Sequence, residues 1–174
     1  TIFDMSGIRY LAPDVKSWTE VLEESKSGRL DVVPAIVSTP ARRDYLNFSR
    51  PYLTFPYVIF TRNDFGLVAD IHDLYGKKIG VEQGYSMGEQ IEKEHPDLNA
   101  IHFENTEDIL QALSVGNIDA YVGNLTVAVY LLNKTGLTNI KVSAATEYTV
   151  DLAIGVNKEF PELYSIIEKS LGLV

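Results

Sequence analysis

The sequence predicts an α/β fold, because short apolar strands alternate with helices over most of its second half. The predicted helices end at a glycine or at a His-Pro pair, as helix stop signals do. Strands and helices at this spacing are typical of βαβ units, whose strands form a parallel sheet. The predicted strands are residues 78–82, 100–103, 118–122 and 140–143, and the helices are residues 87–93, a segment from Asn105 or Thr106 to 115, and residues 125–134.

The first part of the chain predicts a helix followed by a strand. Ser17 and Glu20 have the spacing of a capping box at the start of a helix over Trp18–Lys26. The apolar segment Leu30–Val37 then resembles a buried strand. The other predicted elements are a weak strand at residues 8–10, a helical turn at 71–75, a return strand at 152–156 and a final helix at 162–171.

The segment Leu53–Thr61 is an extended apolar run that contains Pro56. Because proline has no backbone N–H, it is usually confined to sheet edges and strand ends. We therefore expect this segment to cross between two parts of the molecule rather than to form a central strand.

Composition excludes several classes of protein. The 174 residues are 45% hydrophobic and 22% charged, as in an ordinary globular protein. A net charge of −9 argues against binding to nucleic acid or to an anionic membrane surface. Since cysteine is absent, there are no disulfides and no thiolate chemistry. The chain begins at Thr1 without a methionine, so we expect it to be part of a longer protein and draw nothing from the lack of a signal peptide.

Residues 31–52 have the features of a ligand-binding edge. The predicted strand ends in Ser38-Thr39-Pro40-Ala41-Arg42, so hydroxyls, backbone N–H groups and a guanidinium come to the carboxyl edge of the sheet. Open α/β sheets bind their ligands at this edge. A guanidinium placed there can hold a carboxylate in bidentate fashion.

Three blocks of this region stand in a characteristic order: Gly28–Asp31, Thr39–Arg42 and Phe48–Tyr52. Together they resemble the signature of bacterial periplasmic solute-binding proteins of the amino-acid type, family 3. Residues 120–125 (AYVGNL) and 138–142 (TNIKV) are similar to segments of those family members that are attached to sensor kinases and cyclases.

The resemblance implies a two-lobed "Venus flytrap" domain with the type II periplasmic-binding-protein-like fold. Residues 1–55 would form part of lobe one, 56–148 lobe two, and 149–174 the return to lobe one, with hinges near Tyr52–Pro56 and Thr146–Asp151. In the family, a unit of about thirty residues precedes the Trp18 region, and we therefore expect lobe one to be incomplete at its N-terminus. A sheet edge would then be open to another chain, which makes a homo-oligomer a hypothesis.

Four candidate ligand contacts belong to lobe one: Trp18, Ser38, Thr39 and Arg42. Adjacent arginines after a turn are usually solvated, but the family's Thr-Pro-x-Arg motif implies that Arg42 binds a ligand carboxylate. Arg43 is expected at the surface. Trp18, the only tryptophan, falls where the family places an aromatic ring over the ligand, although a tryptophan in an amphipathic helix is more often a core residue.

The segment Gly84–Gly88 matches Gly-x-Ser-x-Gly between a strand and a helix, which is the context of a hydrolase nucleophile. A hydrolase triad needs a histidine later in the chain, and no histidine lies beyond residue 102. The helix N-terminus is instead a favourable anion site, and the family uses this loop to close on a carboxylate. Tyr85 and Ser86 are therefore candidate contacts, with Glu82 beside them.

Asn124 is the last candidate contact. Amino-acid-binding members commonly carry an aspartate here, which pairs with the ligand's α-ammonium group. Asparagine is neutral and gives no such charge pairing, which argues against an α-amino acid ligand. Asn124 is also a suitable N-cap for the helix that follows, and the two roles are compatible.

These observations predict a non-catalytic solute-binding domain with no cofactor and no metal site. We expect an extracytoplasmic (periplasmic) sensor module of a membrane signalling protein, which binds a small carboxylate or amino-acid-like ligand by hinge closure. One alternative is a free binding protein of an ABC transporter. Another is a dehydratase-like enzyme on the same scaffold, for which Glu82 is the candidate acid or base.

Overall fold

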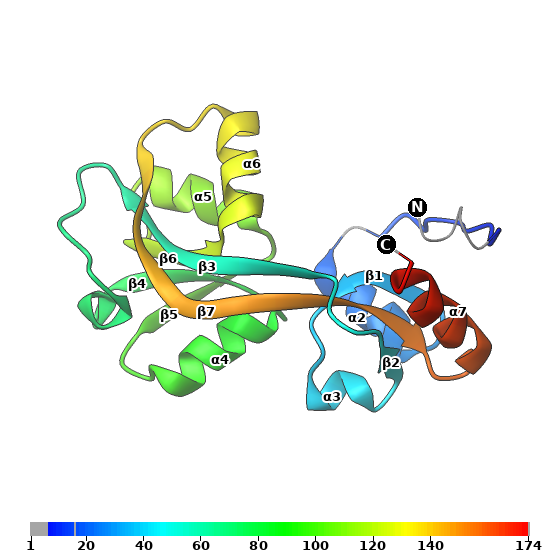
Figure 1. The fold of residues 1–174 in the computed structure, drawn as a ribbon. Helices are drawn as coiled ribbons and strands as arrows, with labels where there is room; N and C mark the ends of the chain where they lie inside the picture. The colour runs from blue at the N-terminus through cyan, green and yellow to red at the C-terminus, as the bar shows by residue number, and fades with distance from the viewer. Residues whose placement is uncertain (1–6, 16, 174) are drawn as a thin grey trace. The chain divides into compact units, whose positions relative to one another are not determined.

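The computed structural model describes residues 7–15 and 17–173, and within them the chain forms two compact units. Unit 1 consists of Thr1–Thr54 and Asp151–Val174, and unit 2 of Phe55–Val150. The two boundaries fall inside strands β3 (Leu53–Arg62) and β7 (Ile140–Asn157), so each of these strands contributes to both units (Figure 1).

Unit 1 is built on a small antiparallel sheet. Strands β1 (Val32–Ile36) and β2 (Leu46–Phe48) both pair with the C-terminal part of β7. Helix α2 (Trp18–Lys26) packs on the face that carries Val33, and α7 (Pro161–Leu171) packs on the face that carries Val32. Because successive strand residues point to opposite faces, these two helices cover opposite sides of the sheet. A short helix, α3 (Pro40–Arg43), connects β1 and β2.

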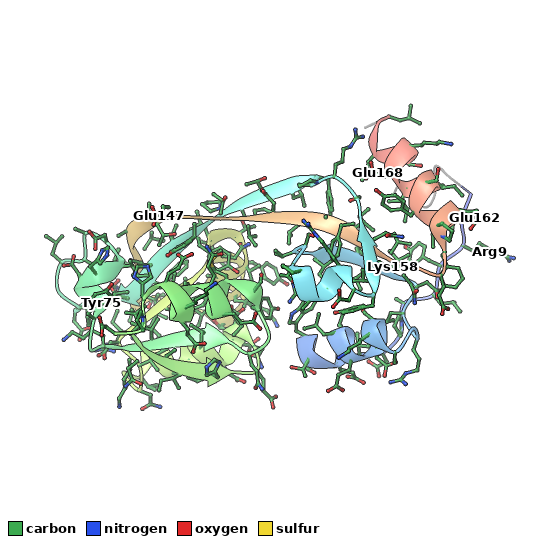
Figure 2. All side chains as sticks on the ribbon, turned by 90° about the horizontal axis from the view of Figure 1, so that it is seen from below. Arg9, Tyr75, Glu147, Lys158, Glu162 and Glu168 are labelled. Carbon is green, nitrogen blue, oxygen red and sulfur yellow. The ribbon has the colours of Figure 1, made fainter. Side chains whose placement is uncertain are left out.

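Helices α2 and α7 begin within one residue of where the sequence predicts, whereas no helix was predicted at α3. The Ser17 hydroxyl accepts a hydrogen bond from the Glu20 backbone N–H at 3.1 Å and caps α2. Pro161 occupies the first turn of α7. Figure 2 labels Glu162 and Glu168 along this helix; the Glu168 carboxylate accepts a hydrogen bond from the Arg50 backbone N–H at 2.7 Å.

Unit 2 is a sheet covered by helices on both faces. Strand β4 (Lys78–Glu82) runs parallel to β5 (Asn99–Phe103) and to β6 (Ala120–Asn124), and β6 is antiparallel to β3. Helix α4 (Ser86–Glu94) covers one face, while α5 (Thr106–Ser114) and α6 (Leu125–Thr135) cover the other (Figure 1). A 3₁₀ turn, η1 (Ile71–Leu74), precedes β4. The core of the α5–α6 face is formed by Val58, Phe60, Ile109, Leu110, Ala112, Leu113, Ile118, Tyr121, Ala128 and Ile140.

The predicted alternation of parallel strands and helices in unit 2 is confirmed, and apart from the strand predicted at 140–143 the boundaries lie within two residues of those expected. Among the described residues, no helix is both long enough and apolar enough to cross a membrane.

The prediction for β3 was wrong in part. The strand does contribute to both units, as expected of a crossing segment, but it also lies between β7 and β6 and is therefore a central strand of the sheet. Its pairing with β6 begins at Tyr57, opposite Asn124. The missing N–H of Pro56 thus lies just outside this ladder and interrupts none of its hydrogen bonds.

The strands predicted at residues 140–143 and 152–156 both form, but not as separate strands, and a third predicted strand does not form. The segments 140–143 and 152–156 are parts of one continuous strand, β7, because residues between them also pair and pack: Tyr148 and Val150 are buried, and the Thr146 hydroxyl donates to the Tyr57 carbonyl at 2.6 Å. The weak strand at residues 8–10 does not form, since no described strand pairs with it and Tyr10 is exposed.

Candidate ligand-binding site

Three of the four predicted contacts of unit 1 lie together and form what we call the Arg42 cluster: Trp18, Thr39 and Arg42. Thr39 caps α3, and its hydroxyl accepts a hydrogen bond from the Arg42 backbone N–H at 3.3 Å. The Arg42 guanidinium donates to the Val37 carbonyl at 3.0 Å, and its Cζ lies 5.6 Å from the centroid of the Trp18 ring. Arg42 is only 7% exposed.

The surroundings of Arg42 explain how a charged side chain is kept largely buried. A carbonyl oxygen and an aromatic face both stabilise a guanidinium that has lost part of its hydration. Trp18 also packs against the core of unit 1, so it is a core residue and a platform for Arg42 at once. Ser38 is occupied differently: its hydroxyl accepts a hydrogen bond from Nε of the exposed Arg43 at 2.7 Å.

The predicted contacts of unit 2 follow two neighbouring strands at one edge of the sheet. In the parallel pairing of β4 with β6, Gly80 lies opposite Tyr121, so Glu82 at the end of β4 is level with Gly123, and Asn124 lies one residue further along. Tyr85 is the N-cap of α4 and Ser86 its first residue. We call Tyr85, Ser86 and Asn124 the Asn124 edge.

Asn124 caps α6 with its side-chain oxygen. Oδ1 accepts hydrogen bonds from the backbone N–H groups of Thr126 at 2.9 Å and Val127 at 3.1 Å. No hydrogen bond of its amide nitrogen Nδ2, nor of the Ser86 hydroxyl, occurs within the described part of the chain.

Glu82 differs from the other predicted contacts because it is an internal side chain, 7% exposed. Its Oε1 accepts hydrogen bonds from the Thr106 hydroxyl at 2.9 Å and from the Tyr121 hydroxyl at 2.5 Å. Burial raises the pKa of the Glu82 carboxyl, and the two hydroxyls oppose part of this shift. Glu82 therefore joins β4, α5 and β6 beneath the Asn124 edge.

Sequence reasoning did not single out Tyr121 and Thr106 for this role. Tyr121 reaches Glu82 because its ring lies over Gly123, where a Cβ atom would come within 1.8 Å of the ring. The one feature of the sequence that could have indicated this contact is a tyrosine two residues before a glycine in an apolar strand. Thr106 is available because Asn105 caps α5.

The hydrolase alternative has no support in the geometry. Ser86 and His95 are at opposite ends of α4, a nine-residue helix, so roughly 13 Å of helix rise separates them. His95 is held by the hydroxyls of Tyr75 at 3.1 Å and Tyr148 at 2.9 Å. No group of three or more His, Cys, Asp or Glu side chains in the described residues is arranged to hold a metal ion.

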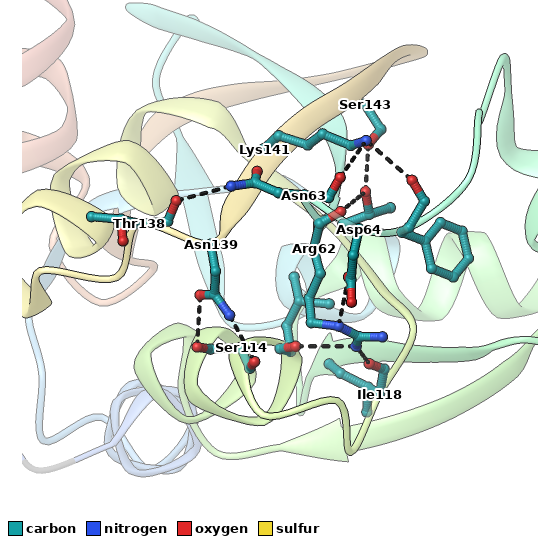
Figure 3. A network of polar contacts seen from close by, with 12 residues as sticks. Arg62, Asn63, Asp64, Ser114, Ile118, Thr138, Asn139, Lys141 and Ser143 are labelled. Carbon is teal, nitrogen blue, oxygen red and sulfur yellow. Dashed lines mark hydrogen bonds and ion pairs between the residues drawn. The ribbon is translucent and has the colours of Figure 1, made fainter.

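A cavity of about 440 Å³ in unit 2 lies at the other end of the sheet. Its wall includes Arg62 (Figure 3). Nη1 of Arg62 donates to the carbonyl of Leu113, near the C-terminal end of α5, and to the carbonyl of Ile118, just before β6. Since β3 and β6 are antiparallel with Tyr57 opposite Asn124, Arg62 is at the far end of β3 from the Asn124 edge. The cavity is separate from the predicted contacts.

Residues 8–173 match the family model of bacterial extracellular solute-binding proteins, family 3, and the chain belongs to this family. The family of this chain shows that it is a solute-binding domain. The predicted family and the predicted periplasmic-binding-protein-like fold are thereby confirmed.

Known proteins similar to this chain include sensors and binding proteins. The virulence sensor protein BvgS of Bordetella pertussis is 24% identical over 167 residues, which cover 95% of this chain and 14% of BvgS. The probable amino-acid-binding protein YxeM of Bacillus subtilis is 30% identical over 120 residues, 67% of this chain and 46% of YxeM. A histidine kinase sensor domain with similarity to periplasmic binding proteins superimposes with a TM-score of 0.91 at 23% identity, over 99% of this chain and 75% of that domain.

Proposed function

We propose that this chain is the extracytoplasmic sensor domain of a membrane signalling protein, and that it binds a small carboxylate-bearing solute without transforming it chemically. The Arg42 cluster is the observation that carries the proposal. A guanidinium held by a carbonyl and stacked on an indole ring is preorganised to receive an anion, because little conformational freedom is left to lose on binding.

In this proposal, Arg42 of unit 1 holds the ligand's carboxylate and Trp18 covers it. Tyr85, Ser86 and Asn124 of unit 2 are further candidate contacts, and hinge closure is the proposed response to binding. The domain would lie outside the cytoplasm, and its closure would pass a signal to the rest of a membrane protein. The similarity of this chain to the virulence sensor protein BvgS and to a histidine kinase sensor domain supports a signalling role.

A free binding protein of a transporter is the second candidate, and the similarity to YxeM favours it. The sequence that follows this domain in the natural protein separates the two: a transmembrane segment and a kinase-type region would support the sensor. A dehydratase-like activity is disfavoured, because the one candidate acid, Glu82, is only 7% exposed and its Oε1 accepts hydrogen bonds from Thr106 and Tyr121.

The test is a thermal-shift screen of small carboxylates and amino acids against the protein and against Arg42→Ala. A ligand that binds the folded state raises the melting temperature. We expect at least one hit that is lost in Arg42→Ala and weakened in Arg42→Lys, which keeps the charge but not the bidentate geometry. The adjacent exposed Arg43→Ala is the matched control and should retain the hit. A screen without any hit, or hits indifferent to Arg42→Ala, would overturn the proposal.

A further inference from the structure

A buried histidine of unit 2 lies in a chain of hydrogen bonds that ends at a surface carboxylate. His95 follows the last residue of α4 and is only 7% exposed. Its Nδ1 lies 3.1 Å from the Tyr75 hydroxyl, and its Nε2 lies 2.9 Å from the Tyr148 hydroxyl. The Tyr148 hydroxyl also donates to Oε2 of the exposed Glu94 at 2.6 Å. We call Tyr75, His95 and Tyr148 the His95 clamp, because it joins the turn after η1, the end of α4 and strand β7.

The donor in each of these hydrogen bonds follows from the number of hydrogens that the groups carry. A carboxylate only accepts, and the hydroxyl of Tyr148 and the amide of Gln90 lower the pKa of Glu94, so its carboxylate is ionised at neutral pH. Tyr148 has one O–H, which it gives to Glu94. Toward His95, the oxygen of Tyr148 is therefore an acceptor, and Nε2 must carry the hydrogen.

The same reasoning fixes the other end of the chain. A neutral imidazole carries one N–H, so with the hydrogen on Nε2 the second nitrogen, Nδ1, is an acceptor. The Tyr75 hydroxyl, 3.1 Å away, then donates to Nδ1. All three hydrogen bonds thus point the same way, from Tyr75 through His95 and Tyr148 to Glu94.

Neighbouring side chains leave this direction unchanged. The ring of His72 lies edge-on to His95 at a centroid distance of 5.4 Å, but its Nδ1 is paired with Asp70 at 3.0 Å. The other carboxylate oxygen of Glu94, Oε1, accepts from the Gln90 amide at 3.0 Å. The direction of the chain therefore depends on the group at position 94.

We propose that the exposed Glu94 sets the hydrogen-bonding state of the buried His95 clamp, so that a change of charge on the surface of α4 is transmitted to β7 and to the turn before β4. With a donor in place of the carboxylate, the Tyr148 oxygen accepts from it and the Tyr148 O–H turns to Nε2. His95 then carries its hydrogen on Nδ1, and Tyr75 accepts. A cationic group that draws the carboxylate away from Tyr148 has the same effect. All of these residues belong to unit 2, and the inference is independent of the ligand site.

Nuclear magnetic resonance tests the first step, the position of the hydrogen on His95. At about pH 9 a histidine side chain is neutral, and two-bond ¹H–¹⁵N spectra show which ring nitrogen carries the hydrogen. The chain has only three histidines, His72, His95 and His102, so the signals are readily assigned. We expect the Nε2–H form for His95. A predominant Nδ1–H form would overturn the inference.

The variant Glu94→Lys tests the control by position 94. It replaces a group that only accepts by an ammonium group that only donates, at an exposed position. We expect the ratio of the Nδ1–H to the Nε2–H form of His95 to rise about tenfold or more, as for a hydrogen bond to a charged group. Glu89→Lys, the same charge change at another exposed position of α4, is the matched control and should leave the ratio unchanged. An unchanged ratio in Glu94→Lys would contradict the inference.

A second pair of variants tests whether the effect passes through Tyr148. Tyr148→Phe keeps the ring and removes the hydroxyl that connects His95 to Glu94. In this background, Glu94→Lys should leave the His95 signals where they are in Tyr148→Phe alone. A shift of the same size with and without the Tyr148 hydroxyl would mean that the charge acts directly on His95, and the chain of hydrogen bonds would not be the route.

Discussion

Glu82 shows that the role of a residue can depend on its neighbours in the structure more than on its chemical type. A glutamate at the end of a strand next to a predicted binding loop suggests a ligand contact. In the structure, Thr106 and Tyr121 both donate to Oε1, and the side chain is buried. Its carboxyl group connects three elements of unit 2 beneath the loops that carry Ser86 and Asn124.

The raised pKa of Glu82 predicts a pH dependence of stability. Between its ordinary pKa of 4.5 and the higher folded value, folded Glu82 holds a proton that the unfolded chain has released. The contribution of Glu82 to the free energy of unfolding therefore falls as pH rises through this window. Above the folded pKa, the charged and buried Glu82 destabilises the folded state to its full extent. In urea denaturation at a series of pH values, the stability of Glu82→Gln relative to the protein should rise with pH above 4.5.

Glu94 provides a control of opposite sign. The Tyr148 hydroxyl and the Gln90 amide donate to its carboxylate and lower its pKa. Its stabilising contribution is present above the unfolded pKa and is lost as pH falls through the folded value. Relative to the protein, Glu94→Gln should therefore gain stability only as pH falls. If the stabilities of the two variants relative to the protein changed with pH in the same direction, the pKa directions given for Glu82 and Glu94 would both be contradicted.

At the scale of the element, strand β6 depends on a close approach between Tyr121 and Gly123. An added Cβ at Gly123 would lie 1.8 Å from Cζ of Tyr121 and 2.0 Å from its hydroxyl oxygen. The Tyr121 ring has little freedom to move, because it stacks on Phe60 at a centroid distance of 5.6 Å and its hydroxyl donates a hydrogen bond to Glu82.

We therefore expect Gly123→Ala to lower the free energy of unfolding by about 3 kcal/mol or more, at the upper end of the cost of overpacking a core. Gly66→Ala is the matched control, since nothing lies within 4 Å of the added Cβ, and its effect should stay within about 0.5 kcal/mol. Urea denaturation measures both. A loss below about 1 kcal/mol for Gly123→Ala would show that Tyr121 repacks at little cost.

Helices whose starts are marked by a capping residue in the sequence were predicted well. Helices α2, α5 and α6 begin at the expected caps Ser17, Asn105 and Asn124, because a capping side chain and its N–H partners lie within three residues of each other. Strand β7 was predicted as two pieces, since the continuity of its residues 144–151 depends on burial of Tyr148 and Val150 by distant parts of the chain.

At the scale of the whole molecule, the two units differ in how their sheets are connected. Unit 2 is one continuous segment, Phe55–Val150, with its own hydrophobic core. In unit 1, β1 and β2 pair with β7 and not with each other, so its sheet needs both ends of the chain.

This difference predicts that residues 55–150 fold alone, whereas residues 1–54 do not, because a segment with its own core is able to fold independently. Circular dichroism during urea denaturation should show a cooperative transition for the first segment and none for the second. A structureless 55–150 segment would mean that unit 2 depends on unit 1 for its stability.

By itself the sequence determined the family, the α/β fold and most helix boundaries, since these follow from short motifs, caps and periodic patterns. It also named the predicted contacts, whose role in binding stays a prediction. Only the tertiary structure decided which atoms of these residues remain available to a ligand: Asn124 Oδ1 is used by α6, and Glu82 Oε1 by Thr106 and Tyr121. The physical reason is that the hydrogen-bonding atoms of a side chain pair with the groups that lie next to them in the folded protein. Those groups come from strands and helices far apart in the sequence.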